Sequence, residues 1–163
     1  PDAKIHVLTH GLHYASAVFE GERAYSGVIF KSTEHSERLK KSANILDFEV
    51  PFSVAEIDTA KNAVIEKNNQ PNAYVRAIAW RGSEQLGVSA LNNTSQLAIA
   101  AGDWPSYFDP AQRAKGIRIC LADYRRPHPK TAPSLAKLTD WAEALACTEG
   151  LEAHRQSVII RKP

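Results

Sequence analysis

Three short segments of the sequence combine side chains that could do chemistry. The first, residues 10–23, sets His, Tyr, Phe, Glu and Arg side chains beside Gly11 and Gly21. Glycine lets a backbone approach a ligand closely, and the polar side chains could orient that ligand. Composition alone favours a plainer interpretation, the start of a helix with exposed polar residues.

The second segment, residues 34–39, carries Arg38 among polar neighbours. An arginine guanidinium binds anions such as phosphate through paired hydrogen bonds. On a helix, however, such an arginine more often forms a surface ion pair, here with Glu34 one turn earlier. The pattern by itself favours the ion pair.

The third segment, residues 131–137, ends in Lys137, which follows small and apolar side chains. A lysine amine in a desolvated pocket can attack a carbonyl group and form a Schiff base. Most lysines with such neighbours are simply exposed, so the segment alone does not establish a catalytic site.

Other catalytic and metal-binding patterns are absent from the sequence. It has no Gly-rich phosphate loop and no GxSxG nucleophile motif. His10 and His13 have no further cluster of ligands that would complete a zinc site, so we expect no metal. Cys120 and Cys147 lack CxxC spacing, which fits a cytoplasmic protein without a structural disulfide.

The composition is that of an ordinary globular protein. The chain has 163 residues, of which 44% are hydrophobic and 23% charged, enough for one domain or a domain and part of another. Lys and Arg number 20 and Asp and Glu 18, and the resulting net charge of +2 gives no reason to expect a nucleic acid or membrane partner. No apolar run approaches the roughly 20 residues of a membrane span.

The first half of the chain predicts a hairpin and two helices. A Ser-Gly turn in residues 24–31 lies between short β-prone stretches and predicts the hairpin. Residues 33–46 repeat apolar side chains at helical spacing, with Thr33 as the expected N-cap. Ser53 begins a capping box, and the helix that it starts should end near Asn68.

The second half favours strands. Residues 73–80 alternate between large polar or aromatic side chains, which share one face, and small side chains on the other. Residues 95–101 and 116–122 predict two further strands, and residues 138–153 have a helix-favouring composition.

A loop rich in aromatic residues and proline divides the chain into two parts. We expect a small α+β domain over residues 1–103, an interdomain loop over 104–115, and the incomplete start of a larger domain over 116–163. One strand, a proline-rich connection and one helix cannot bury a core. We therefore expect either that the tail packs onto the first domain or that most of the second domain lies outside these residues.

Together, the three segments resemble the fold-type IV pyridoxal-phosphate aminotransferases, and within them the branched-chain amino acid aminotransferases. The most specific pieces are the Phe-Glu-Gly-x-Arg-x-Tyr segment at residues 19–25 and the His-x-x-Arg-Leu segment at residues 35–39. The pieces that match, in order, are residues 2–14, 18–25, 35–39 with 42–43, 73–76, 87–88, 104–107 and 132–137. The resemblance implies a two-domain α+β fold, with a small N-terminal domain and a larger domain that binds the cofactor.

The resemblance also implies a role for individual residues. Lys137 matches the Schiff-base lysine that holds pyridoxal 5'-phosphate and shuttles a proton, and Arg38 matches the arginine that grips the cofactor phosphate. Val88 matches a loop position that reaches the neighbouring subunit's site. The positions that match the family's substrate pocket are Tyr14, Phe19, Gly21, Arg23, Tyr74, Arg76, Trp104 and Tyr107.

The implied activity is transamination of leucine, isoleucine or valine with 2-oxoglutarate by a homodimer or larger homo-oligomer. Two alternatives stay open. One is a D-amino acid aminotransferase or an aminodeoxychorismate lyase of the same fold; the other is a truncated, non-catalytic paralogue. We also expect the 163-residue chain, made alone, to be inactive, because the resemblance places further cofactor-binding groups beyond it. We expect it to associate as well, because residues 116–163 would leave apolar faces and the edge of the strand at residues 116–122 uncovered.

Overall fold

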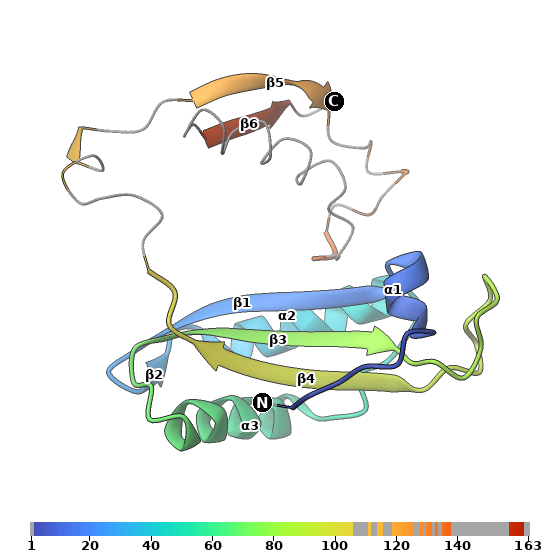
Figure 1. Ribbon diagram of the computed structural model, residues 1–163, viewed down its shortest axis with the longest axis horizontal. Helices are drawn as coiled ribbons and strands as arrows, with labels where there is room; N and C mark the ends of the chain where they lie inside the picture. Colours follow the sequence, from blue (N-terminus) through green and yellow to red (C-terminus); the bar gives the residue numbers. More distant parts are fainter. Residues whose placement is uncertain are drawn as a thin grey trace. The chain divides into compact units, whose positions relative to one another are not determined.

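The computed structural model divides the chain into two compact units (Figure 1). One unit comprises residues 1–104 and 135–139, and the other comprises residues 105–134 and 140–163. Lys137 therefore belongs to the first unit, although the sequence grouped it with a second domain. The residues that the structure describes are 2–105, 111, 114–115, 119–125, 128, 130–131, 133, 135–137 and 157–161.

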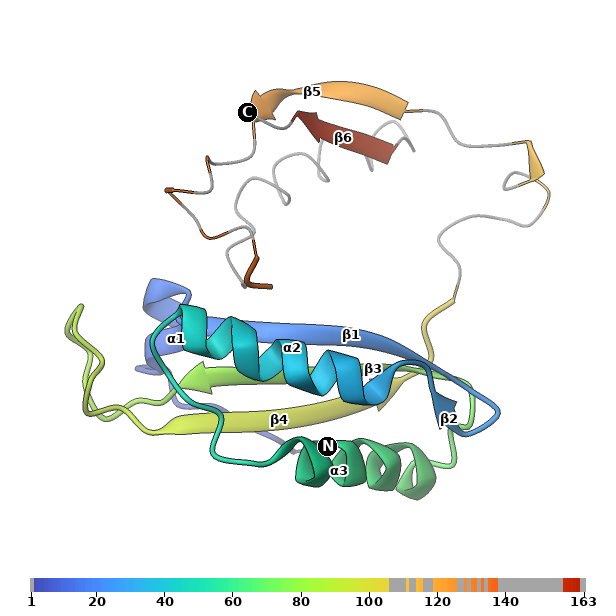
Figure 2. The ribbon, with the colours of Figure 1, turned by 180° about the vertical axis from the view of Figure 1, so that it is seen from behind.

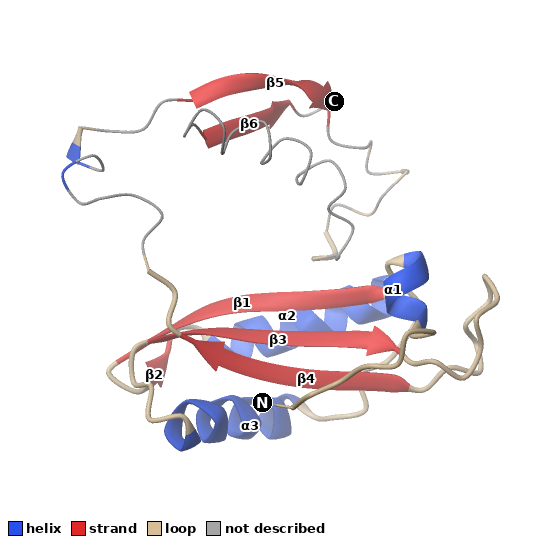
Figure 3. Ribbon diagram, viewed as in Figure 1, coloured by secondary structure: helices blue, strands red, loops and turns tan. Residues whose placement is uncertain are grey.

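An antiparallel sheet of four strands, in the order β2-β1-β3-β4, forms the centre of the first unit (Figure 3). The predicted hairpin is confirmed, since Ser26 and Gly27 have φ values of 50° and 83° and connect β1 to β2. Positive φ at both central residues matches the right-handed twist of the strands on either side. The strands are β1 (Ala17–Tyr25), β2 (Val28–Ile29), β3 (Ala73–Arg81) and β4 (Ser95–Gly102).

Two long helices, α2 (Ser32–Ile45) and α3 (Val54–Lys67), cover one face of this sheet (Figure 2). The short helix α1 (His10–Tyr14) lies beside the start of β1, and the segment before it crosses the opposite face of the sheet (Figure 1). No helix among the described residues is long and apolar enough to cross a membrane.

The two helix starts differ in how well the sequence predicted them. The capping box of α3 is confirmed, because the Ser53 side chain and Glu56 satisfy each other's backbone N–H groups. The N-cap predicted at Thr33 is wrong: the cap position is Lys31, two residues earlier, and α2 begins at Ser32. The Thr33 hydroxyl instead donates to Asp58 of α3 at 2.8 Å.

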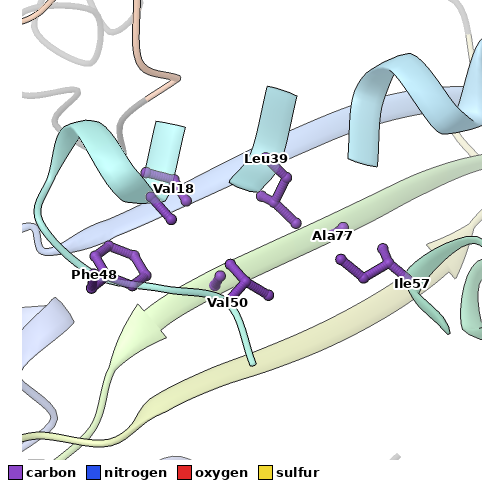
Figure 4. Close-up of a cluster of buried hydrophobic side chains, with 8 residues drawn as sticks. Val18, Leu39, Phe48, Val50, Ile57 and Ala77 are labelled. Carbon is purple, nitrogen blue, oxygen red and sulfur yellow. The ribbon is translucent and has the colours of Figure 1, made fainter. Parts of the chain in front are cut away.

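The hydrophobic core lies between the helices and the sheet (Figure 4). It takes Val18 and Ala24 of β1 and the residues from Ala73 to Ala79 at odd-numbered positions of β3, whose small side chains let α2 and α3 approach closely. The alternation predicted for residues 73–80 is therefore confirmed. The core residues labelled in the figure are Val18, Leu39, Phe48, Val50, Ile57 and Ala77.

A buried ion pair ties the sheet to both helices. The side chains of Lys61 in α3 and Glu22 in β1 are fully buried, and Lys61 Nζ lies 2.7 Å from Glu22 Oε1. Nζ also donates to Ser36 Oγ of α2 at 2.8 Å. Burial raises the pKa of Glu22 above that of an ordinary glutamate and outweighs the hydrogen bond and charge of Lys61.

Two parallel strands, β5 (Ile119–Arg125) and β6 (Ser157–Arg161), are described in the second unit. The first of them confirms a strand at the place predicted for residues 116–122, with residues 116–118 outside the described part. The helix predicted over residues 138–153 also lies outside the described residues.

Candidate active site

The backbone of Lys137 lies against an open edge of the sheet. Strand β1 pairs along most of its length with β3, but with β2 only at Ala24 and Tyr25. On the open part of this edge, the Phe19 N–H donates to the Lys137 carbonyl at 3.1 Å. The Lys137 N–H in turn donates to Ser42 Oγ of α2 at 3.1 Å. The lysine segment is thereby fixed between β1 and α2.

The Lys137 side chain lies over the aromatic ring of Phe19. Its Nζ is 5.0 Å from the ring centroid, within the range of a cation–π contact. Ala136, just before it, is buried in the same unit. The structure therefore brings two of the predicted site residues, far apart in the sequence, into contact.

Arg38 lies on α2 one turn before Ser42, but its partner is not the one expected for a surface arginine. Nε and Nη2 donate to the two carboxylate oxygens of Glu20 at 2.7 and 2.6 Å. The ion pair with Glu34 is not formed, because Glu34 pairs with Lys31 instead. The pair that is formed joins α2 to β1.

The Glu20 carboxylate is fully buried and also accepts a hydrogen bond from His35 Nδ1 at 2.8 Å. Burial by itself would raise the pKa of Glu20. The hydrogen bonds from Arg38 and His35, together with the positive charge of Arg38, outweigh burial and hold that pKa below its usual value. Glu20 is therefore an ionised group in the interior whose charge is balanced by Arg38.

The face of the sheet away from the helices carries most of the predicted substrate residues. Gly21 on β1 lies opposite Arg76 on β3, and Arg23 lies opposite Tyr74. The Arg76 guanidinium lies 4.4 Å from the Phe19 ring centroid. It also donates to Tyr74 Oη from Nη2 at 2.8 Å and from Nε at 3.1 Å. Cations and aromatic rings therefore alternate on one surface.

Gly21 is required by this arrangement. A Cβ atom at Gly21 would lie 2.1 Å from Tyr74 Oη and 2.9 Å from its Cζ, far inside any allowed contact. The missing side chain is what allows the Tyr74 hydroxyl to lie across β1 and accept from Arg76.

Trp104, which follows the end of β4, contacts two residues of this surface, Tyr74 and Arg23. Its ring lies 5.0 Å from the Tyr74 ring, centroid to centroid, and its carbonyl accepts a hydrogen bond from Arg23 Nη1 at 2.8 Å. The structure thus joins six of the predicted pocket residues in one network on β1, β3 and the residues after β4. Tyr107 lies outside the described residues. The six are Phe19, Gly21, Arg23, Tyr74, Arg76 and Trp104.

Tyr14 and Val88 form a second group at the α1 end of the sheet. The Tyr14 ring stacks on His10 at 4.5 Å, and His10 Nε2 lies 3.1 Å from the Gly87 carbonyl and 3.3 Å from that of Val88. Val88 itself is 81% exposed. Within the described part of the chain, no hydrogen bond or ring contact joins this group to Lys137.

Tyr14 also borders a hollow of about 570 Å³ on the face of the sheet opposite the long helices. Its walls are mostly apolar and come from α1, the segment before it and three strands. The lining residues are Ile5, Thr9, Gly11, Leu12, His13, Tyr14, Ala15, Ala17, Ile78, Trp80 and Ala98.

The sequence interpretation missed the parts played by Glu20 and Ser42, which hold Arg38 and the Lys137 backbone. Glu20 is 18 residues from Arg38, and Ser42 is 95 residues from Lys137. No helical or strand periodicity relates residues at such separations, so the signal was available only through the matching motifs.

The family that matches this chain is described as amino-transferase class IV, and it aligns with residues 17–160. The chain belongs to this family. Among the relatives of this class IV aminotransferase chain is a Rickettsia felis protein named "Probable branched-chain-amino-acid aminotransferase", with 45% identity over 135 residues. That match covers 83% of the chain and 45% of the relative.

The chain is also similar to solved structures of branched-chain aminotransferases. The crystal structure of the Escherichia coli branched-chain amino acid aminotransferase gives a TM-score of 0.90 at 34% identity and covers 99% of this chain and 55% of that one. That of a Thermoproteus uzoniensis branched-chain aminotransferase with norvaline gives 0.89 at 27% identity, with the same coverage. A further branched-chain amino acid aminotransferase structure, with pyridoxamine 5'-phosphate, gives 0.90 at 33% identity. The predicted α+β fold-type IV architecture is confirmed. The chain spans about half the length of these relatives.

Proposed function

We propose that the protein carrying this chain is a pyridoxal-phosphate-dependent branched-chain amino acid aminotransferase. It would exchange the amino group of leucine, isoleucine or valine with 2-oxoglutarate. The observation that carries the proposal is the fixed position of Lys137, hydrogen-bonded to β1 and to α2 one turn after Arg38. Relatives and solved structures named for this activity support it.

The residues of this edge suit the cofactor chemically. Lys137 offers a primary amine for its aldehyde, and Arg38 offers a half-exposed guanidinium for its phosphate. When bound, pyridoxal phosphate supplies an electron sink for negative charge at the substrate's Cα. Lys137 and Arg38 would be the groups of this chain that hold it.

The other residues would orient the substrate. The rings of Phe19 and Trp104 suit an aliphatic side chain, and Gly21 leaves room beside them. Arg76, fixed by Tyr74 Oη, brings positive charge for a substrate carboxylate. Lys137 Nζ, beside the Phe19 ring, would accept and hold the proton released at Cα.

The proposal includes a cytoplasmic homodimer. The loop that holds Val88 is exposed and anchored by His10, as suits a loop that reaches a neighbouring subunit. The composition carries no sign of a nucleic acid or membrane partner, and the partners proposed are amino acids and 2-oxo acids.

The test is Lys137→Ala in the protein expressed from its complete coding sequence. We expect loss of the visible absorbance of bound pyridoxal phosphate and of leucine:2-oxoglutarate turnover. Borohydride reduction of the wild type, followed by peptide mapping, should mark Lys137. Lys130→Ala, an exposed lysine of the same connection, is the control and should keep both properties. Cofactor retention and turnover in Lys137→Ala would refute the assignment.

A further inference from the structure

Glu20 is buried on the helix side of β1, where an uncompensated carboxylate would be strongly unfavourable. Two residues from one turn of α2 donate hydrogen bonds to this carboxylate. Oε1 accepts from Arg38 Nε, and Oε2 accepts from Arg38 Nη2 and from His35 Nδ1. The guanidinium therefore has a fixed plane, set by a carboxylate in the interior of the unit.

The rest of the guanidinium faces away from Glu20. The Arg38 side chain is 49% exposed, while that of Glu20 is 0% exposed. Because Nε and Nη2 bind the two Glu20 oxygens side by side, Nη1 and the second hydrogen of Nη2 lie on the side of the guanidinium group that faces away from Glu20. Within the described part of the chain, no residue accepts a hydrogen bond from Nη1. An anion could therefore be bound on this side without breaking the pair with Glu20.

We propose that Glu20 is a positioning residue that holds the Arg38 guanidinium ready to receive the phosphate group of the cofactor. This inference rests on the proposed function, in which Arg38 binds that phosphate. Glu20 touches neither substrate nor cofactor in this account; it acts through Arg38. His35 completes the arrangement by hydrogen-bonding the same carboxylate oxygen as Arg38 Nη2.

Glu20 has two opposing effects on phosphate binding, so the direction in which that binding changes when Glu20 is replaced tests the inference. The negative charge of Glu20 disfavours a second anion nearby, so its removal would strengthen phosphate binding if charge alone mattered. The fixed guanidinium plane favours binding, because a free arginine must be ordered when the anion arrives. The inference requires the second effect to be larger.

The experiment compares the dissociation constants of pyridoxal 5'-phosphate and of pyridoxal, which lacks the phosphate, for the apo-protein expressed from its complete coding sequence. The preference for the phosphorylated form, taken as the ratio of the pyridoxal constant to the pyridoxal 5'-phosphate constant, isolates the contribution of the phosphate from general damage to the fold. We expect Glu20→Gln to reduce that ratio about three- to ten-fold, the range that corresponds to ordering one side chain. Arg38→Ala should reduce it further.

Glu22→Gln is the matched control. Glu22 lies on the same strand and is as deeply buried, but its partner is Lys61. The variant removes a nearby negative charge without touching the hydrogen bonds of Arg38, and should leave the ratio unchanged or slightly raised, as the effect of charge alone requires. Glu20→Asp keeps the charge but shortens the arm, and should reduce the ratio as Glu20→Gln does. It also serves as the test variant if Glu20→Gln does not fold.

The outcomes separate the inference from the proposed function. A ratio unchanged or raised in the Glu20 variants, with Arg38→Ala still reducing it, would overturn the role of Glu20 alone. An equal reduction in Glu22→Gln would also overturn it. A wild-type protein that does not bind pyridoxal 5'-phosphate, or an Arg38→Ala variant with an unchanged ratio, would refute the proposed function together with the inference.

Discussion

At the scale of single residues, Gly21 shows how little space the candidate site leaves. In Gly21→Ala the new Cβ would meet Tyr74 Oη at 2.1 Å, so the tyrosine ring must swing away and lose its hydrogen bonds with Arg76. In the proposed function Arg76 binds the substrate carboxylate, so we expect KM for the amino acid to rise about ten-fold when Arg76 loses its orientation. The unfolding free energy should fall only by about 1–3 kcal/mol. Steady-state kinetics and urea unfolding measure the two effects.

The control for this substitution is Gly102→Ala. Gly102 lies opposite Tyr74 on the neighbouring strand, but a Cβ there has no heavy atom within 4 Å. It should leave KM and the stability close to those of the wild type. If Gly21→Ala behaved like Gly102→Ala, the network of Tyr74 and Arg76 would have no role in binding.

The buried carboxylate of Glu20 has a consequence for the acid side of the stability profile. Its pKa is lowered in the folded state because hydrogen bonds from Arg38 and His35 outweigh burial. Its contribution is therefore fully present above the unfolded-state pKa, about 4.3, and is lost as the pH falls through the folded-state pKa. Glu20→Gln should flatten that part of the decline, measured as unfolding free energy against pH.

Glu22 should behave in the opposite sense, which provides an internal comparison. Its folded-state pKa is raised, mainly by burial. Stability from Glu22 is therefore present at low pH and is lost as the pH rises from about 4.3 through the folded-state pKa. Glu22→Gln should remove this loss and leave the acid decline due to Glu20. Profiles that changed in the same direction for both variants would contradict the assigned shifts.

At the scale of elements, the sequence predicted what depends on neighbouring residues. The Ser26-Gly27 turn and the capping box at Ser53 are complete within a few residues, and both are confirmed. The alternation of β3 was equally visible. The N-cap at Thr33 failed because its hydroxyl binds Asp58, which is 25 residues away on another helix. Helical spacing likewise gave no sign that Lys61 is buried.

The residues of the candidate site also divide into those that the sequence indicated and those that only the folded structure reveals. Lys137 and Arg38 were predicted through the resemblance, and no periodicity singled them out. Their partners Glu20 and Ser42 are determined by how α2 packs on β1, which is a property of the folded unit. Position-by-position interpretation cannot find such pairs, because long-range partners leave no local pattern.

The contact between β1, α2 and α3 leads to a prediction about Lys61. Lys61→Met removes the positive charge beside the buried Glu22 and the donor to Ser36 Oγ. Breaking a buried pair in this way typically costs about 3–5 kcal/mol. We expect a loss of that size in the unfolding free energy near neutral pH, measured by urea denaturation. The loss should shrink at acid pH, where Glu22 takes up a proton.

A double variant tests the cause. Lys61→Met with Glu22→Leu removes both charges and should recover most of the stability lost by Lys61→Met, because the cost comes from the uncompensated carboxylate. If the double variant instead lost the sum of what the two single variants lose, packing of the lysine side chain, and not its charge, would hold these elements together.

At the scale of the whole molecule, the first unit has its own hydrophobic core but also exposes several large apolar side chains. Its core is closed by α2 and α3 on one face of the sheet. Several large apolar side chains outside that core remain open to solvent in the described residues. They include Val7 at 72%, Leu12 at 59%, Val88 at 81% and Leu91 at 78% exposed. Exposed apolar surface, where it is contiguous, marks a place where another protein surface binds.

The last prediction concerns residues 1–163 expressed by themselves. They match 45% of the Rickettsia felis relative and 55% of the Escherichia coli structure, so much of what those proteins use is not represented in them. We expect no measurable leucine:2-oxoglutarate turnover, and concentration-dependent association through the exposed apolar side chains. Enzyme assay and light scattering over a range of concentrations measure these. The protein from the complete coding sequence is the control. Turnover comparable to that control, from a monodisperse sample, would show that these residues already contain a working cofactor site.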